Sequence, residues 1–312
     1  MKTNYPRVCL MTLAFAGLTA CGGGGGGSGA VSGGVGVTVT PFTTWSAIAP
    51  GSTIEVAGDS QEGTYTFNTI TNSVTARTVG AQQSGAIFTE SFSATPPYLA
   101  QNVRFRTASG TDISFSRAID NFFVLNMNTN FWGVESADGT KYALMADPVE
   151  TGWEYQSFGI WTTGAGTGSG AYGSASVGSP TPAGSIPTSG TATYYGYAGG
   201  RHVASDGSHY FTIAAMQTSA NFATRQLNFA TPYTEQTPNL YTSAMNGSLN
   251  MTGTLNYSPG SNQFSGAVST AGGMTGTAQG RFYGPAAEEI GGTFSVTGPG
   301  VQSYGGAFGG AR

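Results

Sequence analysis

The chain carries little charge for its length. Only 8% of its 312 residues are Asp, Glu, Lys or Arg, whereas about 25% is usual in globular domains. The formal net charge of −4 provides none of the basic surface that binding to nucleic acid requires. We therefore expect no nucleic-acid partner.

Residues suited to catalysis or metal binding are also scarce. The chain has two cysteines and two histidines, His202 and His209, and no Gly-x-Ser-x-Gly, P-loop or His-Glu-x-x-His motif. A metal or haem site at the histidines would need carboxylates such as Asp206 as further ligands. We expect polar loop histidines, no cofactor and no enzyme, with haem or another iron-bearing ligand as the alternative.

One pair of neighbouring acids could be taken for a catalytic pair. Glu288 and Glu289 are adjacent, so a strand would direct their side chains to opposite faces. We expect them instead to cap and solvate the turn after Pro285.

What the sequence has in quantity is glycine and aromatic residues. The 50 glycines follow no strict G-X-Y period, which excludes collagen, and 12% aromatic residues are too many for a disordered chain. No segment keeps a helical period for three turns, and turn signals recur about every ten residues, as in sandwiches and barrels. The sequence therefore predicts an all-β fold.

The first twenty residues have the order of a secretory signal. Two basic residues precede an apolar run over 8–18, about half the length of a membrane-spanning helix. The run ends in Leu-Thr-Ala-Cys at 18–21, which resembles the lipobox of bacterial lipoproteins. The resemblance implies that residues 1–20 are removed and that Cys21 is lipidated. An ordinary signal followed by a chance cysteine is the alternative.

Residues 21–40 would then form a lipidated, glycine-rich linker. The run from Gly22 to Gly27 cannot build a core and is typical of flexible tethers. Cys9 would leave with the signal, so the mature chain would contain no disulfide. Gly rather than Asp follows Cys21, which in Gram-negative lipoproteins favours the outer membrane. We expect a protein held in the outer membrane by its lipid and exposed at the cell surface.

The remaining chain divides into two β-rich parts. Short turn-bounded runs fill residues 41–165, and the Gly/Ser/Pro-rich stretch 166–190 predicts a linker. Over 245–257 the odd positions are apolar or Gly and the even ones are polar, which predicts one strand with one buried face. Residues 191–312 thus hold about eight strands, enough to close an antiparallel barrel with its apolar sides inward; the other runs start near Ala192, Ser208, Phe222, Gln263, Met274, Ile290 and Ser303.

Two segments of the C-terminal part resemble a known family. Residues 280–294, GRFYGPAAEEIGGTF, and the ending Gly-Gly-Ala-Phe-Gly-Gly-Ala-Arg at 305–312 are similar to the last barrel strands of transferrin-binding protein B and related surface lipoproteins. The run YQSFGIW at 155–161 resembles the last strand of the preceding domain, called the handle, and 178–196 resembles the linker and first barrel strand of single-lobed members. The resemblance implies a β-rich handle domain over 41–165 followed by a soluble eight-stranded antiparallel β-barrel over 191–312.

The same resemblance implies a binding protein without catalysis. It would be anchored in the outer membrane and would capture a ligand, or a host or environmental protein, for iron or nutrient acquisition. A TonB-dependent transporter and a surface-export translocon are the further partners that the family implies. The family's transferrin contacts cannot be matched in this chain, so transferrin itself is not implied. A structural or shielding surface lipoprotein without cargo is the alternative.

Two features suit recognition of a partner. Aromatic residues flank a polar tip at 126–130 and could anchor an interface, although alternating aromatics also build cores; they are Phe122, Phe123, Phe131 and Trp132. Acids gather between Glu135 and Glu154 with only Lys141 among them. These acids could steer a basic partner, and a solvated loop face is the alternative.

Overall fold

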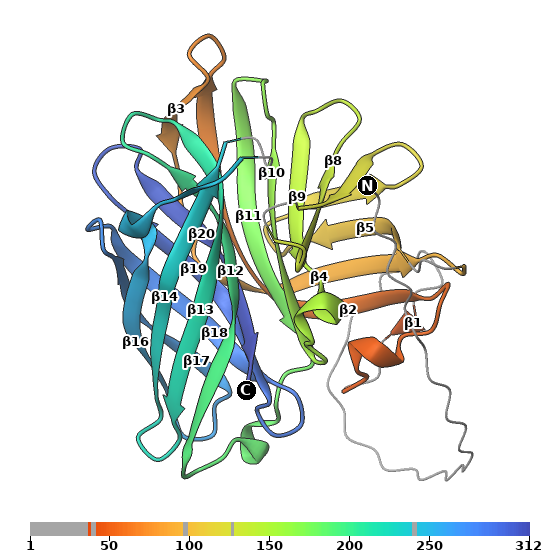
Figure 1. The fold of residues 1–312 in the computed structure, drawn as a ribbon, viewed down its shortest axis with the longest axis vertical. Coiled ribbons are helices and arrows are strands. Elements are labelled where there is room, and N and C mark those ends of the chain that lie inside the picture. The colour runs from red at the N-terminus through yellow and green to blue at the C-terminus, as the bar shows by residue number, and fades with distance from the viewer. Residues whose placement is uncertain (1–36, 39–41, 96–98, 126–127, 239–241) are drawn as a thin grey trace.

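The computed structural model describes residues 37–38, 42–95, 99–125, 128–238 and 242–312. Cys21 and all of the predicted tether over 21–40 except Val37–Thr38 lie outside these residues. The described chain folds into two mainly antiparallel β sheets that lie side by side (Figure 1), and none of its helices is long and apolar enough to cross a membrane. The all-β prediction is confirmed.

The first sheet, which we call the handle sheet, is curled and open. Its strand order is β6-β5-β4-β2-β11-β10-β9-β8-β7, so the end strands β6 and β7 are neighbours in the chain without being paired. The strands are β1 (Val37–Thr38), β2 (Thr53–Asn68), β3 (Ser73–Arg77), β4 (Gln83–Phe92), β5 (Ala100–Arg106), β6 (Asp112–Ser116), β7 (Asn121–Val124), β8 (Phe131–Glu135), β9 (Lys141–Ala146), β10 (Gln156–Thr163) and β11 (Ser169–Gly178). Short helices η1 (Trp45–Ala47) and α1 (Pro148–Thr151) lie beside it.

Strand β11 corrects the predicted linker over 166–190. It pairs with β10 on one side and β2 on the other, in the middle of the handle sheet. Its small residues reflect close packing, because a Cβ on Gly173 would lie 2.3 Å from the Trp161 ring. Only the segment after β11, which includes helix η2 (Ala183–Ser185), connects the two sheets.

The second sheet is the predicted eight-stranded antiparallel barrel. Pairing between β13 and β14 closes the order β13-β12-β20-β19-β18-β17-β16-β14. The strands are β12 (Thr191–Val203), β13 (His209–Asn221), β14 (Gln226–Thr237), β16 (Met251–Tyr257), β17 (Gln263–Thr270), β18 (Thr275–Tyr283), β19 (Glu289–Thr297) and β20 (Ser303–Ala311), with the two-residue β15 (Ala244–Met245) beside β14.

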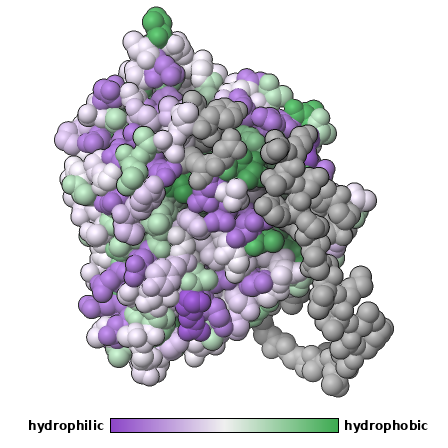
Figure 2. Space-filling view, in the orientation of Figure 1, coloured by the Kyte–Doolittle hydropathy of each residue, from purple (hydrophilic) through white to green (hydrophobic). Residues whose placement is uncertain are grey.

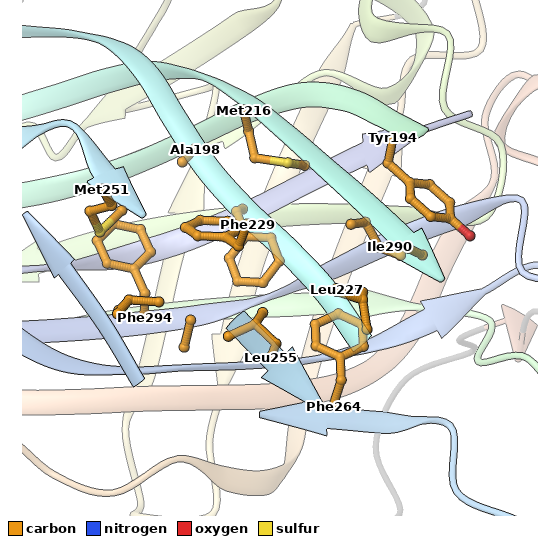
Figure 3. Packing of buried hydrophobic residues seen from close by; sticks show 14 of the residues in the cluster. Tyr194, Ala198, Met216, Leu227, Phe229, Met251, Leu255, Phe264, Ile290 and Phe294 are labelled. Atoms are coloured by element: carbon orange, nitrogen blue, oxygen red, sulfur yellow. The ribbon is translucent and has the colours of Figure 1, made fainter. Parts of the chain in front are cut away.

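The apolar faces of these strands point into the barrel. Figure 3 shows large side chains from strands on opposite walls meeting in its interior, among them Phe229, Leu255 and Phe294. All three are buried, and Phe229 also packs against Phe308 with 5.0 Å between ring centroids. The alternation read from the sequence is therefore the inward face of a closed barrel.

The single strand predicted over 245–257 is interrupted. The side chain of Asn246 accepts a hydrogen bond from the Ser248 N–H and starts the 3₁₀ helix η3 (Gly247–Leu249). Strand β16 begins only at Met251, and Met245 is exposed. An Asn side chain that bonds its own backbone competes with strand pairing, which the apolar–polar alternation does not reveal.

The handle sheet packs on the outer face of β19 and β20. The Asp59 carboxylate forms two 2.6 Å hydrogen bonds with Arg281 across this interface. The outward positions of β19 and β20 are small, because a Cβ on Gly309 would lie 2.5 Å from the side chain of Gln156 on β10. Figure 1 accordingly shows β10 and β11 running close beside β20.

Glu289 joins the two parts and corrects the expectation of a solvated turn. Its carboxylate is buried at the interface and accepts hydrogen bonds from the N–H groups of Glu154 (2.6 Å) and Tyr155 (3.0 Å). Burial is the main cause that raises the pKa of Glu289 to about 7, although these hydrogen bonds act the other way.

Candidate binding groove of the handle

An apolar groove of about 540 Å³ opens at the edge of the handle sheet. Its walls come from η1, the ends of β4 and β5, strands β7 and β8, and the start of α1. We call it the handle groove; its lining residues are Trp45, Ser46, Ile48, Ala49, Pro50, Glu90, Phe92, Leu99, Ala100, Arg117, Phe122, Phe123, Val124, Trp132, Asp147, Pro148 and Val149.

The groove continues the core of the handle. The concave side of the sheet is filled by a buried cluster that includes Phe88, Phe105 and Trp161. Phe92, Phe122 and several other groove residues pack against this cluster and remain half-buried. Because the described strands leave the sheet open between β6 and β7, the core ends there in an opening.

Alternation along the β7–β8 hairpin decides which predicted aromatics reach the groove. Phe122 and Trp132 lie on its concave face and stack with ring centroids 5.8 Å apart at 18°. Phe123 lines the groove from the other side of β7 and also packs against the cluster between handle and barrel. The structure thus brings three of the four aromatics to one groove.

Phe131 corrects the fourth expectation. Its side chain is only 1% exposed and packs edge-on against Phe158 of the handle and Tyr197 of the barrel, with centroids 5.8 and 5.7 Å away. It stabilises the junction between the two sheets, so it offers no surface to a partner.

Exposed apolar side chains mark the rim of the groove. Leu99, Val124 and Val149 are 42%, 59% and 49% exposed. Figure 2 shows several separate deep green patches at the top and on the right of the view, whereas the lower left is a finer mixture of purple, white and pale green. Exposed apolar side chains gathered around one groove are typical of interaction sites.

Few polar groups line the groove, and they are held in place. The guanidinium of Arg117 lies 4.5 Å from the centre of the Phe122 ring and donates a 2.6 Å hydrogen bond to the Ala100 carbonyl, and its burial lowers the pKa of Arg117. Asp147 caps α1 by accepting a 3.0 Å hydrogen bond from the Val149 N–H. These contacts favour binding by shape and apolar surface, with polar groups that orient the bound molecule.

The two histidines lie within strands and not in the predicted loop. His202 is buried in the barrel wall with Nδ1 3.1 Å from the Gln236 side-chain oxygen. His209 has Nδ1 2.7 Å from the Arg201 guanidinium, and burial, assisted by that charge, lowers the pKa of His209 to about 4. Among the described residues no three His, Cys, Asp or Glu side chains lie close enough to hold a metal ion.

Most residues of the groove carried no signal in the sequence. Trp45, Phe92 and Val149 come from segments far from the β7–β8 hairpin, and their convergence depends on the curl of the sheet. The aromatic alternation found Phe122 and Trp132 only because both lie in one hairpin.

Comparison with solved structures finds relatives of low similarity. A single-residue variant of transferrin-binding protein B from Haemophilus parasuis shares 13% identity, with 74% of this chain and 54% of that chain covered and a TM-score of 0.39. The haemoglobin receptor HpuA from Kingella denitrificans shares 20% identity over 73% and 82% of the two chains, with a TM-score of 0.42. Transferrin-binding protein B from Neisseria meningitidis shares 14% over 74% and 53%, with a TM-score of 0.38. The chain spans about half the length of the two transferrin-binding proteins.

The comparison by family is more direct. No curated protein matches the chain. Residues 186–312, however, match the family described as the C-lobe and N-lobe beta barrels of Tf-binding protein B, and these residues hold all eight strands of the closed barrel. The barrel of this chain is therefore similar to the barrels of the transferrin-binding protein B family.

Proposed function

We propose that this chain is a lipid-anchored surface protein of the outer membrane that binds a ligand, or a host or environmental protein, in iron or nutrient acquisition. The handle groove is the observation that carries the proposal. Its stacked aromatic pair and exposed apolar rim have the composition of an interface centre, and they belong to a chain whose barrel is of the transferrin-binding protein B type. No covalent chemistry is required, since a rigid scaffold presents a surface for capture.

The proposed anchor would set where this capture occurs. A lipidated Cys21, exposed by removal of residues 1–20, would tether the handle and the barrel next to a TonB-dependent transporter through the linker that begins at residue 21. Tethering raises the local concentration of cargo at the transporter without any new contact. A dedicated export translocon would place the protein on the outer leaflet. Protease treatment of intact cells tests this, because Cys21→Ser should abolish the cleavage seen with the unchanged protein.

Affinity capture tests the binding function. The purified full-length protein is exposed to host fluids and to the medium of cells grown under iron starvation or repletion. Retained material is identified by mass spectrometry. We expect a saturable cargo that Val149→Asp weakens by about tenfold, since this change places a charge on the apolar rim. Ile70→Asp is the matched control, because Ile70 is 93% exposed on the β2–β3 hairpin and lies outside the groove.

The outcomes separate the two functions considered. A cargo retained equally by both variants would place binding outside the handle groove. A protein that retains nothing under either iron condition would be a structural or shielding lipoprotein, and the binding function would be wrong.

A further inference from the structure

Strand β7 is a free edge beside the handle groove. It pairs only with β8 among the described residues, in the antiparallel register that sets Phe122 opposite Val134 and Val124 opposite Trp132. Edge strands present a row of unpaired N–H and C=O groups to any extended chain that approaches. The direction of these groups follows from the hydrogen bonds of the hairpin.

Only alternate residues of β7 bond to β8. The Leu125 N–H donates to the Phe131 carbonyl at 3.1 Å, which makes 125 and 131 a hydrogen-bonded pair. In an antiparallel ladder such pairs alternate with non-bonded ones, so the backbone groups of Phe122 and Val124 point away from β8. No described residue donates a hydrogen bond to, or accepts one from, the backbone of Phe122 or Val124 outside the strand pairing.

The opposite edge of the sheet is closed at the corresponding place. At the end of β6, the Ser116 N–H donates to the Asp120 carboxylate at 2.7 Å. The Ser116 carbonyl accepts from the N–H groups of Ile119 (3.0 Å) and Asp120 (2.7 Å). A segment that entered the gap between β6 and β7 would therefore find no free backbone partner at Ser116.

The charges around the groove select the occupant. Asp147 lines the groove, Glu150 lies on α1, and the Glu154 carboxylate accepts a 3.0 Å hydrogen bond from the N–H of Ser46 in the groove wall. Arg117 is the one cation among the lining residues, and it already bonds a carbonyl. The described surface around the handle groove thus has more acidic than basic side chains, so it complements a cationic segment.

Resting on the proposed binding function, we propose that the groove takes an extended segment of a partner protein that pairs with β7 as an added strand. Alternate side chains of that segment lie on the face of Phe122 and Val124 and enter the groove. These side chains are bulky and apolar, and Lys or Arg residues of the segment lie near Asp147, Glu150 and Glu154. The backbone of β7 gives affinity, and the groove and acids give specificity.

A peptide array tests this with the full-length protein. The peptides have roughly eight residues, the length of a short strand, and alternate apolar residues (Val, Leu, Phe or Trp) with Thr, Lys or Glu. Binding is followed by fluorescence anisotropy, and quenching of tryptophan emission reports contact, since Trp45 and Trp132 line the groove. We expect the Lys-containing members to bind best and their Glu counterparts to bind at least about tenfold more weakly.

Backbone pairing is tested by two matched changes. Two versions of the peptide are methylated at alternate backbone nitrogens, one at the odd and one at the even positions, which removes hydrogen-bond donors without changing side chains. Only alternate N–H groups can face β7, so one of the two versions should lose binding. Val124→Pro removes an outward N–H that β8 does not use, a place where edge strands tolerate proline. It should weaken binding by about tenfold more than Val124→Thr does, because Val124→Thr alters the same groove side chain but keeps the N–H and the branched Cβ.

The results distinguish this inference from the function on which it rests. Strand addition at β7 is wrong if no peptide binds. It is also wrong if both methylated peptides bind as tightly as the unmethylated one and Val124→Pro binds peptide as tightly as the unchanged protein. Cargo capture that persists in both Val124→Pro and Val149→Asp would then leave the binding function standing at another surface. Loss of capture in Val149→Asp with full capture in Val124→Pro would mean that the groove binds without strand addition.

Discussion

Replacing Glu289 with Gln should change how the stability of the protein depends on pH. Burial raises the pKa of this carboxyl from 4.5 to about 7, so the folded protein holds a proton there that the unfolded chain has released. Stability from this group is fully present below pH 4.5 and is lost as the pH rises through 7. One pKa unit corresponds to about 1.4 kcal/mol, so the free energy of unfolding should fall by about 3 kcal/mol over this interval.

His209 opposes this trend in the unchanged protein. Its pKa is lowered from 6.5 to about 4, so its contribution is present above pH 6.5 and is lost as the pH falls through 4. The magnitude is again about 3 kcal/mol. Between pH 4.5 and 6.5 the two groups therefore nearly cancel. In Glu289→Gln only the histidine remains, and stability should rise steeply across the same window.

Urea unfolding at a series of pH values measures both effects. The informative quantity is the difference in free energy of unfolding between the unchanged protein and Glu289→Gln, because every other titrating group cancels in it. This difference should fall by about 3 kcal/mol from pH 4.5 to about 8. Glu288→Gln, the same change one residue earlier, controls for the loss of a charge from the turn. A difference that stays constant, or rises, would mean that the N–H groups of Glu154 and Tyr155 keep Glu289 ionised throughout.

Three further predictions concern the contact between handle and barrel and the barrel histidine. Arg281→Met leaves the buried Asp59 carboxylate without its two hydrogen bonds and should reduce stability by about 3–5 kcal/mol, whereas adding Asp59→Leu should restore much of the loss in denaturant unfolding. Gly207→Ala should reduce stability by about 1–3 kcal/mol more than Gly190→Ala does. Both glycines have a positive φ, but a Cβ at 207 would lie 2.4 Å from the Val74 carbonyl oxygen, whereas a Cβ at 190 would meet nothing within 4 Å. Equal losses would show that the hairpin yields there. The His209 imidazole should stay neutral at pH 5.5 in NMR spectra, and a midpoint near the ordinary 6.5 would mean that water reaches it.

The sequence predicted the barrel because each barrel strand has two different faces. Side chains that point into the closed core are large and apolar, so their period of two is visible wherever the outer face is polar. On β19 and β20 the outer face is covered by the handle, and the alternation there is between aromatic and small residues, such as Phe308 and Gly309.

The sequence misjudged places where small residues pack closely. The linker predicted over 166–190 contains β11, whose Gly, Ser and Ala residues are typical both of tethers and of a strand covered on both faces. Composition cannot separate these cases, because the covering elements lie far away in the chain. The tether over 21–40 and Cys21 lie outside the described residues except for Val37–Thr38, so that expectation stays a prediction.

The candidate site was half visible in the sequence for a geometric reason. Period two places Phe122 with Trp132 and sets Phe131 on the other face of the same hairpin. The sequence could have divided the aromatics into these two sets, but it could not say which face the barrel covers. That choice depends on Phe158 and Tyr197, which hold Phe131 at the junction of the two sheets.

The junction also explains why an open sheet can keep a groove at its edge. A half-closed sheet with an exposed apolar core tends to close or to aggregate. Here one face of the β7–β8 hairpin is fixed against the barrel through Phe131, so the hairpin cannot swing toward β6 without exposing that buried contact. A change that loosens Phe131 should therefore impair the groove without touching a groove residue. Phe131→Leu tests this: quenching of Trp132 by acrylamide should increase, and cargo capture should fall by more than the loss of global stability accounts for.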